Sequence, residues 1–187
     1  AASDALSWFG RVLGAAPEDM TAGLGPLQAP SSTLFLPYLG GERTPHNDAA
    51  IRASFLHLDH ATGRAAMVRA VLEGVTHAVR DSYDALTGTG TRIESLIAVG
   101  GGSRSDYWLK AIATSLGLPI SVPVAGDFGG AFGAARLAMM AASGAGAEIA
   151  TAPRIAKTIE PDTTLASAFA EAHARYSAAY SALKGLT

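Results

Sequence analysis

The chain has 187 residues, of which 49% are hydrophobic, so it is long enough and apolar enough to bury the core of one globular domain. Its formal net charge of −2 gives no general attraction to nucleic acid or to anionic membranes, and we expect neither as a partner. The absence of cysteine excludes disulfides, thiolate metal sites and a cysteine nucleophile, and it fits the reducing cytoplasm, where we expect the protein. Residues 1–10 lack the pattern of a signal peptide, and the apolar stretch 131–142 is too short to span a membrane.

The N-terminal part alternates helical and extended patterns. Apolar residues at helical spacing predict an amphipathic helix over 4–13, and the Ala-, Gly- and Pro-rich segment 15–32 predicts a surface connection with a short helical turn near Pro17. A strand-like run over 33–39 then leads into a polar loop that includes Glu42–Asp48. This loop either faces a ligand cleft or forms an interface, and both alternatives stay open.

The longest periodic segment runs from about residue 64 to residue 86 and predicts a helix about 34 Å long, enough to cross the domain as its central support. Thr62 is the expected N-cap, and Gly88 with Gly90 ends the helix. The apolar face should consist of Val68, Val71, Leu72, Val75, Val79, Tyr83 and Leu86.

After this helix the pattern becomes strand, helix, strand. An apolar run over 95–99 breaks into the glycine turn Gly100–Gly102, a helix follows to Leu116, and residues 120–124 alternate like a strand. A second Gly-rich turn over 126–130 leads into the next helix.

The C-terminal part should contain two more helices. The many Ala and Gly residues of the helix over 131–142 predict close packing against another backbone. A strand-like pattern over 154–160 precedes a last helix to Leu183, with Phe169, Tyr176 and Tyr180 on its apolar side. The alternation of strands and helices predicts an α/β domain over residues 1–187. A sheet of three or four strands beside four substantial helices leaves an edge uncovered, so we expect further strands of the same sheet to precede Ala1.

The glycine turn Gly100–Gly102 is the feature most indicative of function. Glycines let a backbone approach a ligand closely, and the start of the following helix favours an anion, so the turn suits a phosphate group. The alternative is a tight connection with no ligand. No Gly-x-x-x-x-Gly-Lys-Ser/Thr sequence occurs, which excludes a P-loop kinase, and Ser105 stands where a dinucleotide fingerprint needs glycine or alanine.

Other chemistry-bearing residues form no recognisable site. His57, Asp59 and His60 cluster, but they lack further ligands and helical spacing, so we expect no metal site. His77 lies beside the apolar face of the long helix, where we expect a hydrogen-bonded packing residue. No Gly-x-Ser-x-Gly elbow supports a hydrolase.

Four spaced motifs together resemble the C-terminal domain of the FGGY carbohydrate kinases, and the resemblance covers essentially the whole chain. The motifs lie at 35–47 (FLPYLGGERTPHN), 69–75 (RAVLEGV), 100–108 (GGGSRSDYW) and 133–138 (GAARLA). The first motif most resembles the xylulose kinases of that family.

The resemblance implies a two-domain enzyme of the ribonuclease-H-like, actin-like ATPase fold that binds sugar and ATP between its domains. The implied reaction transfers a phosphoryl group, with Mg²⁺, from ATP to a pentulose, D-xylulose giving D-xylulose 5-phosphate. The family's catalytic aspartate and its phosphate-binding hairpin belong to the part N-terminal to this chain, so we expect no catalytic base here and an inactive chain on its own. A homodimer is a further possibility.

By motif position, the resemblance assigns the nucleotide to the glycine turn. Gly101 and Gly102 correspond to glycines whose backbone passes the α-phosphate and ribose, and Ser103 with Arg104 lines the same mouth. Asp106 corresponds to a position that meets the adenine edge.

Ser7, and with it Ser3, corresponds to positions that face the nucleotide from the opposite wall. Each assignment has a simpler alternative: Ser103 or Ser105 as a helix cap, Asp106 as a complement to the helix dipole, and the first two serines as solvated residues. For Ser3 and Ser7 we favour the alternative.

Two positions depart from the family pattern. His57 stands where the family usually has glycine, and Ala66 replaces an acidic or polar residue, so these departures bear on the local backbone and the identity of the sugar rather than on the fold. Other functions also remain open: a non-catalytic nucleotide-binding or interaction module, and, less favoured, a dinucleotide-binding oxidoreductase domain.

Overall fold

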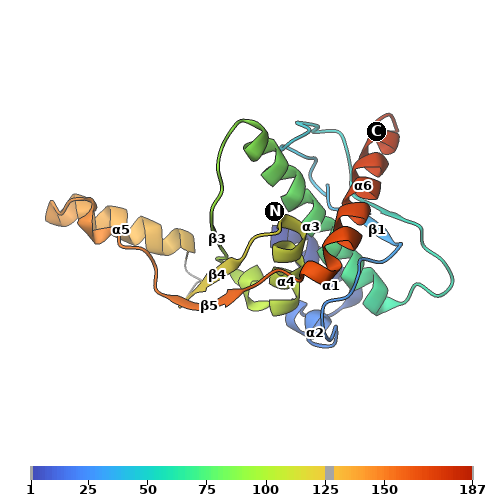
Figure 1. The fold of residues 1–187 in the computed structure, drawn as a ribbon, viewed down its shortest axis with the longest axis horizontal. Coiled ribbons are helices and arrows are strands. Elements are labelled where there is room, and N and C mark those ends of the chain that lie inside the picture. The colour runs from blue at the N-terminus through green and yellow to red at the C-terminus, as the bar shows by residue number, and fades with distance from the viewer. Residues whose placement is uncertain (1, 125–128, 187) are drawn as a thin grey trace.

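The computed structural model describes residues 2–124 and 129–186. It has the predicted mixed α/β architecture, with a body of packed elements from which one helix projects (Figure 1). In chain order, the helices and strands are α1 (Ala2–Leu13), α2 (Pro17–Ala22), β1 (Leu34–Leu36), β2 (Ser54–Leu56), α3 (Arg64–Gly88), β3 (Leu96–Ile97), α4 (Asp106–Leu116), β4 (Ile120–Pro123), α5 (Gly129–Ser143), β5 (Ile155–Ile159) and α6 (Ala166–Leu183).

Helix α3 is the support of the body, as its periodicity predicts. Its middle, Ala70–His77, is buried on every side, because α1, β1, α4 and α6 all pack against it. A Cβ placed on Gly74 would overlap the carbonyl oxygen of Phe35, so only glycine lets β1 approach this closely.

The start of α3 corrects one expectation. Gly63, and not Thr62, is the N-cap, and no side chain caps the helix there. The Thr62 hydroxyl instead donates to Asp59 Oδ1 at 2.8 Å and accepts from the Asp59 amide at 3.0 Å, closing the preceding turn. Directly after β2 and before that turn, His57 has a φ of 58°, a left-handed conformation that favours glycine.

The strands form two separate sheets. β3 pairs with β4 in parallel, β4 pairs with β5 in antiparallel, and β1 pairs with β2 as a second antiparallel unit. One face of the larger sheet packs on α4, through Leu109 and Ala113 against Ile120 and Val122. The predicted order of strand, helix and strand is therefore confirmed, although β3 is shorter than the apolar run over 95–99 that predicts it.

Helix α6 packs on α3 and β1 through the aromatic side chains expected on its apolar side. Phe169, Tyr176 and Tyr180 are buried, and the Tyr176 hydroxyl donates to that of Tyr38 at 2.8 Å. Burial raises the pKa of Tyr176 well above its usual range, so this hydroxyl stays protonated as a donor.

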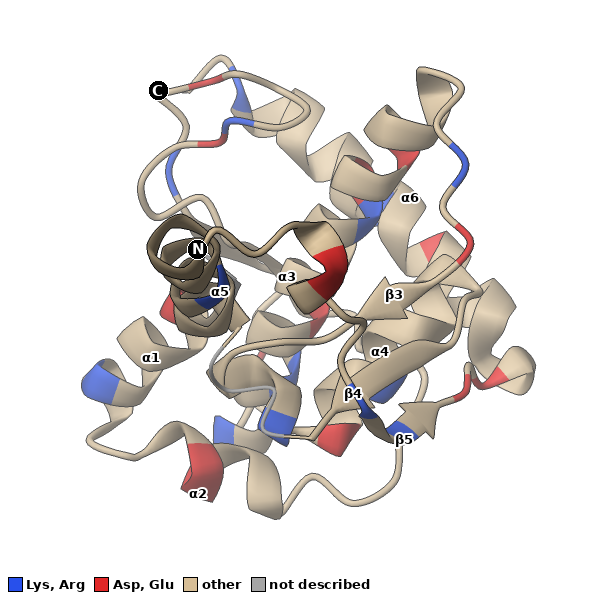
Figure 2. Ribbon diagram, turned by 90° about the vertical axis from the view of Figure 1, so that its left-hand side faces the viewer, with Lys and Arg blue, Asp and Glu red and all other residues tan. Residues whose placement is uncertain are grey.

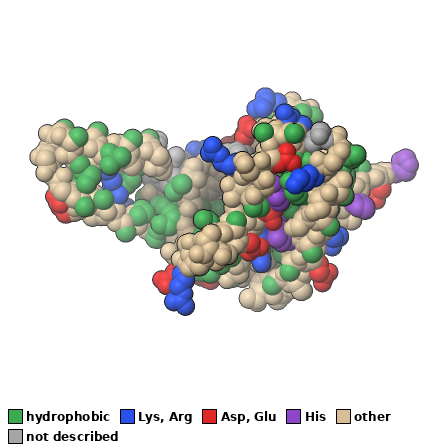
Figure 3. All heavy atoms as spheres, turned by 90° about the horizontal axis from the view of Figure 1, so that it is seen from above, with side chains coloured by type: hydrophobic (Ala, Val, Ile, Leu, Met, Phe, Trp, Pro, Cys, Tyr) green, Lys and Arg blue, Asp and Glu red, His purple; other side chains and the backbone are tan. Residues whose placement is uncertain are grey.

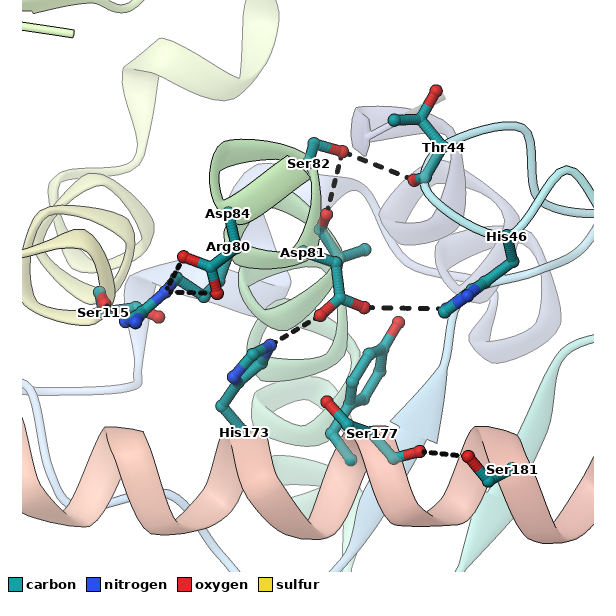
Figure 4. A network of polar contacts seen from close by, with 12 residues as sticks. Thr44, His46, Arg80, Asp81, Ser82, Asp84, Ser115, His173, Ser177 and Ser181 are labelled. Atoms are coloured by element: carbon teal, nitrogen blue, oxygen red, sulfur yellow. Dashed lines mark hydrogen bonds and ion pairs between the residues drawn. The ribbon is translucent and has the colours of Figure 1, made fainter. Parts of the chain in front are cut away.

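A polar cluster joins α6 to α3 beside these aromatic residues (Figure 4). Asp81 Oδ1 lies 2.6 Å from His173 Nε2, and Asp81 Oδ2 lies 3.8 Å from His46 Nε2. His77 is buried next to this cluster, but neither of its ring nitrogens has a hydrogen-bond partner among the described residues. The expectation that His77 packs in the core is confirmed, and the expectation that it is hydrogen-bonded is wrong.

The polar loop Glu42–Asp48 folds back on itself. The backbone N–H groups of Glu42 and Asp48 each donate to the other residue's carbonyl oxygen, at 2.8 and 2.7 Å. Asp48 Oδ1 also accepts from the amides of Ala50 and Ile51, and these bonds hold the pKa of the Asp48 carboxyl below its usual value. The loop is thus a closed turn beside α6.

Helix α5 does not pack as its small residues predict. None of its described residues is buried, and Phe132, Leu137 and Met139 are 49%, 68% and 58% exposed. The helix extends away from the body as a separate lobe, over which apolar side chains are scattered (Figures 1 and 3). The close packing expected for residues 131–142 is therefore wrong within the part of the chain that the structure describes.

Two negative observations apply to residues 2–124 and 129–186. No helix there is long and apolar enough to cross a membrane, and no group of three or more His, Cys, Asp or Glu side chains could hold a metal ion. Acidic and basic residues are interspersed over the body in the view of Figure 2. Residues 126–128 of the second predicted glycine turn lie outside the described residues, while Gly129 and Gly130 begin α5.

Candidate functional site

A pocket of about 460 Å³ lies where α1, α2 and the glycine turn meet, and its size falls in the range of small-molecule sites. α1 contributes Ser3, Leu6 and Ser7, which share one face of the helix because they are three and four residues apart. The rest of the lining comes from α2, the glycine turn and the start of α4: Pro17, Glu18, Thr21, Ala22, Gly101, Gly102, Arg104, Ser105 and Trp108.

The glycine turn presents bare backbone to this pocket. Gly100 has a φ of 84°, which glycine adopts at little cost, and the Ser103 amide and hydroxyl both donate to the Gly100 carbonyl oxygen, at 3.0 and 2.7 Å. These bonds close a 3₁₀ turn over Gly101–Arg104. A Cβ placed on Gly101 would meet nothing within 4 Å, so a ligand has room to lie directly against this backbone.

The turn runs straight into the N-terminus of α4. Ser105 caps this helix, with its Oγ accepting from the Trp108 amide at 3.3 Å, and both Ser105 and Arg104 line the pocket. The positive end of the helix dipole and the arginine therefore lie on the same wall. That wall suits an anionic group.

The opposite wall has a different character. Glu18 of α2 brings a carboxylate, and Ser3, Ser7 and Thr21 bring hydroxyl groups. A carboxylate repels phosphate, so a ligand with one anionic and one uncharged end fits best with its anionic end towards the glycine turn. A nucleotide has such an anionic end, its phosphates, and such an uncharged end, its base.

A buried ion pair fixes the connection that follows α2. Glu73 of α3 is 4% exposed and accepts from the Ser31 amide at 3.1 Å and from Arg69 at 3.1 Å, while Arg69 also donates to Gln28 and to the carbonyl of Ala29. Burial raises the pKa of the Glu73 carboxyl, an effect that the arginine opposes. The segment after α2 is therefore anchored to the centre of the body.

The structure brings together most of the residues that the resemblance assigns to the nucleotide. Gly101, Gly102, Arg104 and Ser7 line the pocket, and Ser3 joins them. The two serines lie in the pocket wall, where a side chain is solvated as long as no ligand covers it. Contact of either serine with a nucleotide stays a prediction.

Two assigned residues lie elsewhere. Ser103 is 7% exposed and turns into the body, where its hydroxyl closes the 3₁₀ turn. Asp106 lies outside the pocket and forms an ion pair with Lys157 of β5. Consecutive residues at a helix start point in different directions, so Ser105 faces the pocket where Asp106 was expected. Contact of Asp106 with adenine stays a prediction.

Sequence patterns did not indicate the wall formed by α2. Residues 15–32 have no apolar period, and the signal present there, Pro17 followed by Glu18 and Asp19, is typical of a helix start but says nothing about a site. The approach of α2 to the glycine turn is a tertiary contact that local sequence does not encode.

A family model described as the C-terminal domain of the FGGY family of carbohydrate kinases matches residues 12–142. The chain belongs to this family. It is 35% identical over 144 residues to the xylulose kinase of Escherichia coli (strain K12), across 76% of this chain and 30% of that protein.

Solved structures agree with this membership. The FGGY domain matches a xyloylose kinase from Brucella ovis at 56% identity with a TM-score of 0.90, over 99% of this chain and 39% of that one. It also matches a gluconate kinase from Lactobacillus acidophilus at 27% identity with a TM-score of 0.77, over 97% of this chain and 38% of that one. The fold is therefore that of the actin-like sugar kinases, and the chain spans about a third of the length of these relatives.

Proposed function

We propose that this chain is the ATP-binding part of a sugar kinase that converts D-xylulose to D-xylulose 5-phosphate. The observation that supports the ATP site most directly is the pocket beneath α1 and α2, where open glycine backbone, Arg104 and the start of α4 share one wall. We assign the phosphates to that wall and the adenosine end to the wall formed by α2.

The chain's own part in the reaction is binding and orientation. Gly101 lets the nucleotide approach the backbone, and Ser105 and Arg104 offer donors to it. Glu18 is the only carboxylate among the residues that line the described pocket, and it lies on the wall away from the phosphates, so we assign the general base to another part of the kinase. The isolated chain should therefore bind ATP without phosphorylating sugar.

We place Mg²⁺ with the nucleotide. No group of three or more His, Cys, Asp or Glu side chains in the described part of the chain could hold a metal ion, so we assign Mg²⁺ to the phosphates of ATP.

Calorimetric titration of the chain with ATP and with NAD tests the nucleotide assignment. We expect ATP to bind and NAD to bind at least tenfold more weakly; preference for NAD would overturn the proposal in favour of a dinucleotide-binding domain. Gly101→Val should weaken ATP binding about tenfold or more, because its side chain would fill space in the pocket without meeting protein atoms. The matched control is Gly63→Val, at another glycine with open surroundings, which should leave ATP binding unchanged.

The sugar needs a separate test. The relatives named as a xylulose kinase and as a gluconate kinase both match this domain, so the domain by itself does not separate their substrates. Initial rates of the complete kinase with ATP, Mg²⁺ and a panel of D-xylulose, D-ribulose, glycerol and D-gluconate should be highest for D-xylulose. Absence of turnover with every sugar, despite ATP binding, would favour a non-catalytic nucleotide-binding module.

A further inference from the structure

Trp108 forms the floor of the pocket directly beneath the glycine turn. It is 3% exposed, yet it belongs to the pocket lining. A Cβ placed on Gly102 would lie 3.2 Å from Cζ3 of the indole, so the backbone of the turn rests on the ring with no side chain between them. The position of the glycine turn relative to the body therefore depends on where this ring lies.

The far side of the indole is fixed to the centre of the body. Trp108 Nε1 donates to the carbonyl oxygen of Leu72 at 3.1 Å, and Leu72 lies in the fully buried stretch of α3. The same oxygen accepts from the Thr76 hydroxyl at 2.8 Å. A buried indole N–H that lost this partner would remain unsatisfied, so the bond favours a single orientation of the ring.

The backbone of Trp108 also takes part in the cap of α4. Its amide donates to Ser105 Oγ, so one residue ties together the cap of the helix, the floor of the pocket and the middle of α3. The other tryptophan, Trp8, stacks on Phe35 with ring centroids 6.0 Å apart and is not part of the pocket lining.

We propose that Trp108 is a positioning residue for the nucleotide: its indole, held by the Leu72 carbonyl, supports the glycine turn in the position that the nucleotide requires. This inference rests on the proposed ATP site. It assigns Trp108 no direct chemistry and predicts that loss of the indole N–H weakens ATP binding through the turn.

The test compares Trp108→Phe with the matched control Trp8→Phe in the whole chain. The first variant keeps an aromatic ring but loses the bond to Leu72, and we expect it to raise the Kd for ATP about tenfold in calorimetry. The second variant should keep the Kd within twofold. Thermal unfolding of both variants separates binding from folding, because a merely structural role would lower the unfolding temperature and leave the Kd of the folded chain unchanged.

Fluorescence provides a second readout, because the chain has two tryptophans. ATP should change the emission of the Trp8→Phe variant, whose remaining indole is Trp108, and should leave the emission of the Trp108→Phe variant unchanged. If the wild-type chain bound no ATP, the proposed function itself would fail. If the wild-type chain bound ATP and Trp108→Phe bound it equally well, the positioning role alone would be overturned.

Discussion

At the scale of single residues, glycines that look alike in the sequence serve different purposes. Gly74 is required because Phe35 passes so close to α3, whereas Gly101 faces open space and leaves room for a ligand. Gly102 combines both situations, since it lines the pocket and also rests on Trp108. A bulky substitution at Gly102 would therefore press on the body as well as fill the pocket, which makes Gly101 the cleaner probe.

Gly74→Ala should destabilise the chain. The new methyl group would overlap the Phe35 carbonyl oxygen, which is backbone and gives way only if β1 moves, so we expect a loss of about 2–3 kcal/mol in the free energy of unfolding. Urea denaturation followed by circular dichroism measures it. Gly133→Ala in α5 is the matched control: its Cβ meets nothing within 4 Å, and a gain of up to about 1 kcal/mol is expected from helix propensity. Equal effects at the two sites would contradict the close approach of β1.

The candidate site divides into a part that the sequence indicates and a part that it does not. Gly100–Gly102 stands out locally, because glycines between an apolar run and a helix leave bare backbone beside the positive end of the helix. Glu18 and Thr21 reach the pocket only because α2 folds back onto α1, and Ser105 takes the expected place of Asp106 through a difference of one residue at the helix start. Contacts made by the tertiary fold decide these details.

At the scale of elements, the interface between α3 and α6 contains a buried ionisable group. His77 packs against the rings of His173 and Tyr176, with centroids 5.8 and 5.3 Å apart, and its nitrogens have no partner among the described residues. Burial first, and then the nearby charges of His173, Arg175 and Arg80, lower the pKa of His77 to about 3.

This histidine should make the chain less stable in mild acid. The unfolded chain binds a proton on His77 near pH 6.5, while the folded chain does so only near pH 3, so stability is fully present above 6.5 and falls as the pH drops below it. Between pH 7 and pH 5 the loss from this group should approach about 2 kcal/mol. His77→Phe, which keeps a ring of similar shape, should flatten this dependence in urea denaturation at the two pH values. His60→Phe, in an exposed turn, is the control and should leave the dependence unchanged.

Sequence periodicity predicted elements better than it predicted their surroundings. The apolar spacing located α1, α3, α4 and α6, because each buries one or more faces in the body. It failed for α5, whose small residues fit tight packing equally well in any location, and it misplaced the N-cap of α3, because Thr62 has a competing partner in Asp59. Capping and burial depend on which neighbours are present, and periodicity does not report them.

At the scale of the whole molecule, α5 gives the chain an apolar projection. Exposed apolar side chains lie on α5 and on the strand ends beside it, where Ile97, Val99 and Val124 are about half exposed. Arg136, the one charged residue between Gly129 and Ser143, lies over the ring of Phe132, so the rest of α5 carries no charge. Surfaces of this kind drive association.

Leu137→Ser should reduce self-association of the isolated chain without changing its stability. Leu137 is 68% exposed, so the substitution removes apolar surface and should alter the free energy of unfolding by less than about 0.5 kcal/mol. Sedimentation velocity across a concentration series measures the effect. Leu186→Ser makes the same chemical change at a residue that is 78% exposed near the end of α6, and it should leave association as in the wild type. Identical behaviour of the two variants would exclude α5 as the associating surface.

The segment between β4 and β5, which contains α5, is attached in a way that should let it tolerate changes in its length. The segment that contains α5 begins at the end of β4 and ends at the start of β5, and these two strands are antiparallel neighbours. The Val124 amide donates to the Arg154 carbonyl oxygen at 2.9 Å and so joins the two ends of the segment. Its ends are thus held by the sheet rather than by the helix. Lengthening a segment held in this way costs only the entropy of closing a longer loop, about 0.6 kcal/mol for each doubling of the loop length. Insertions should therefore be tolerated better between α5 and β5, outside the family motif at 133–138, than in any segment that lines the pocket.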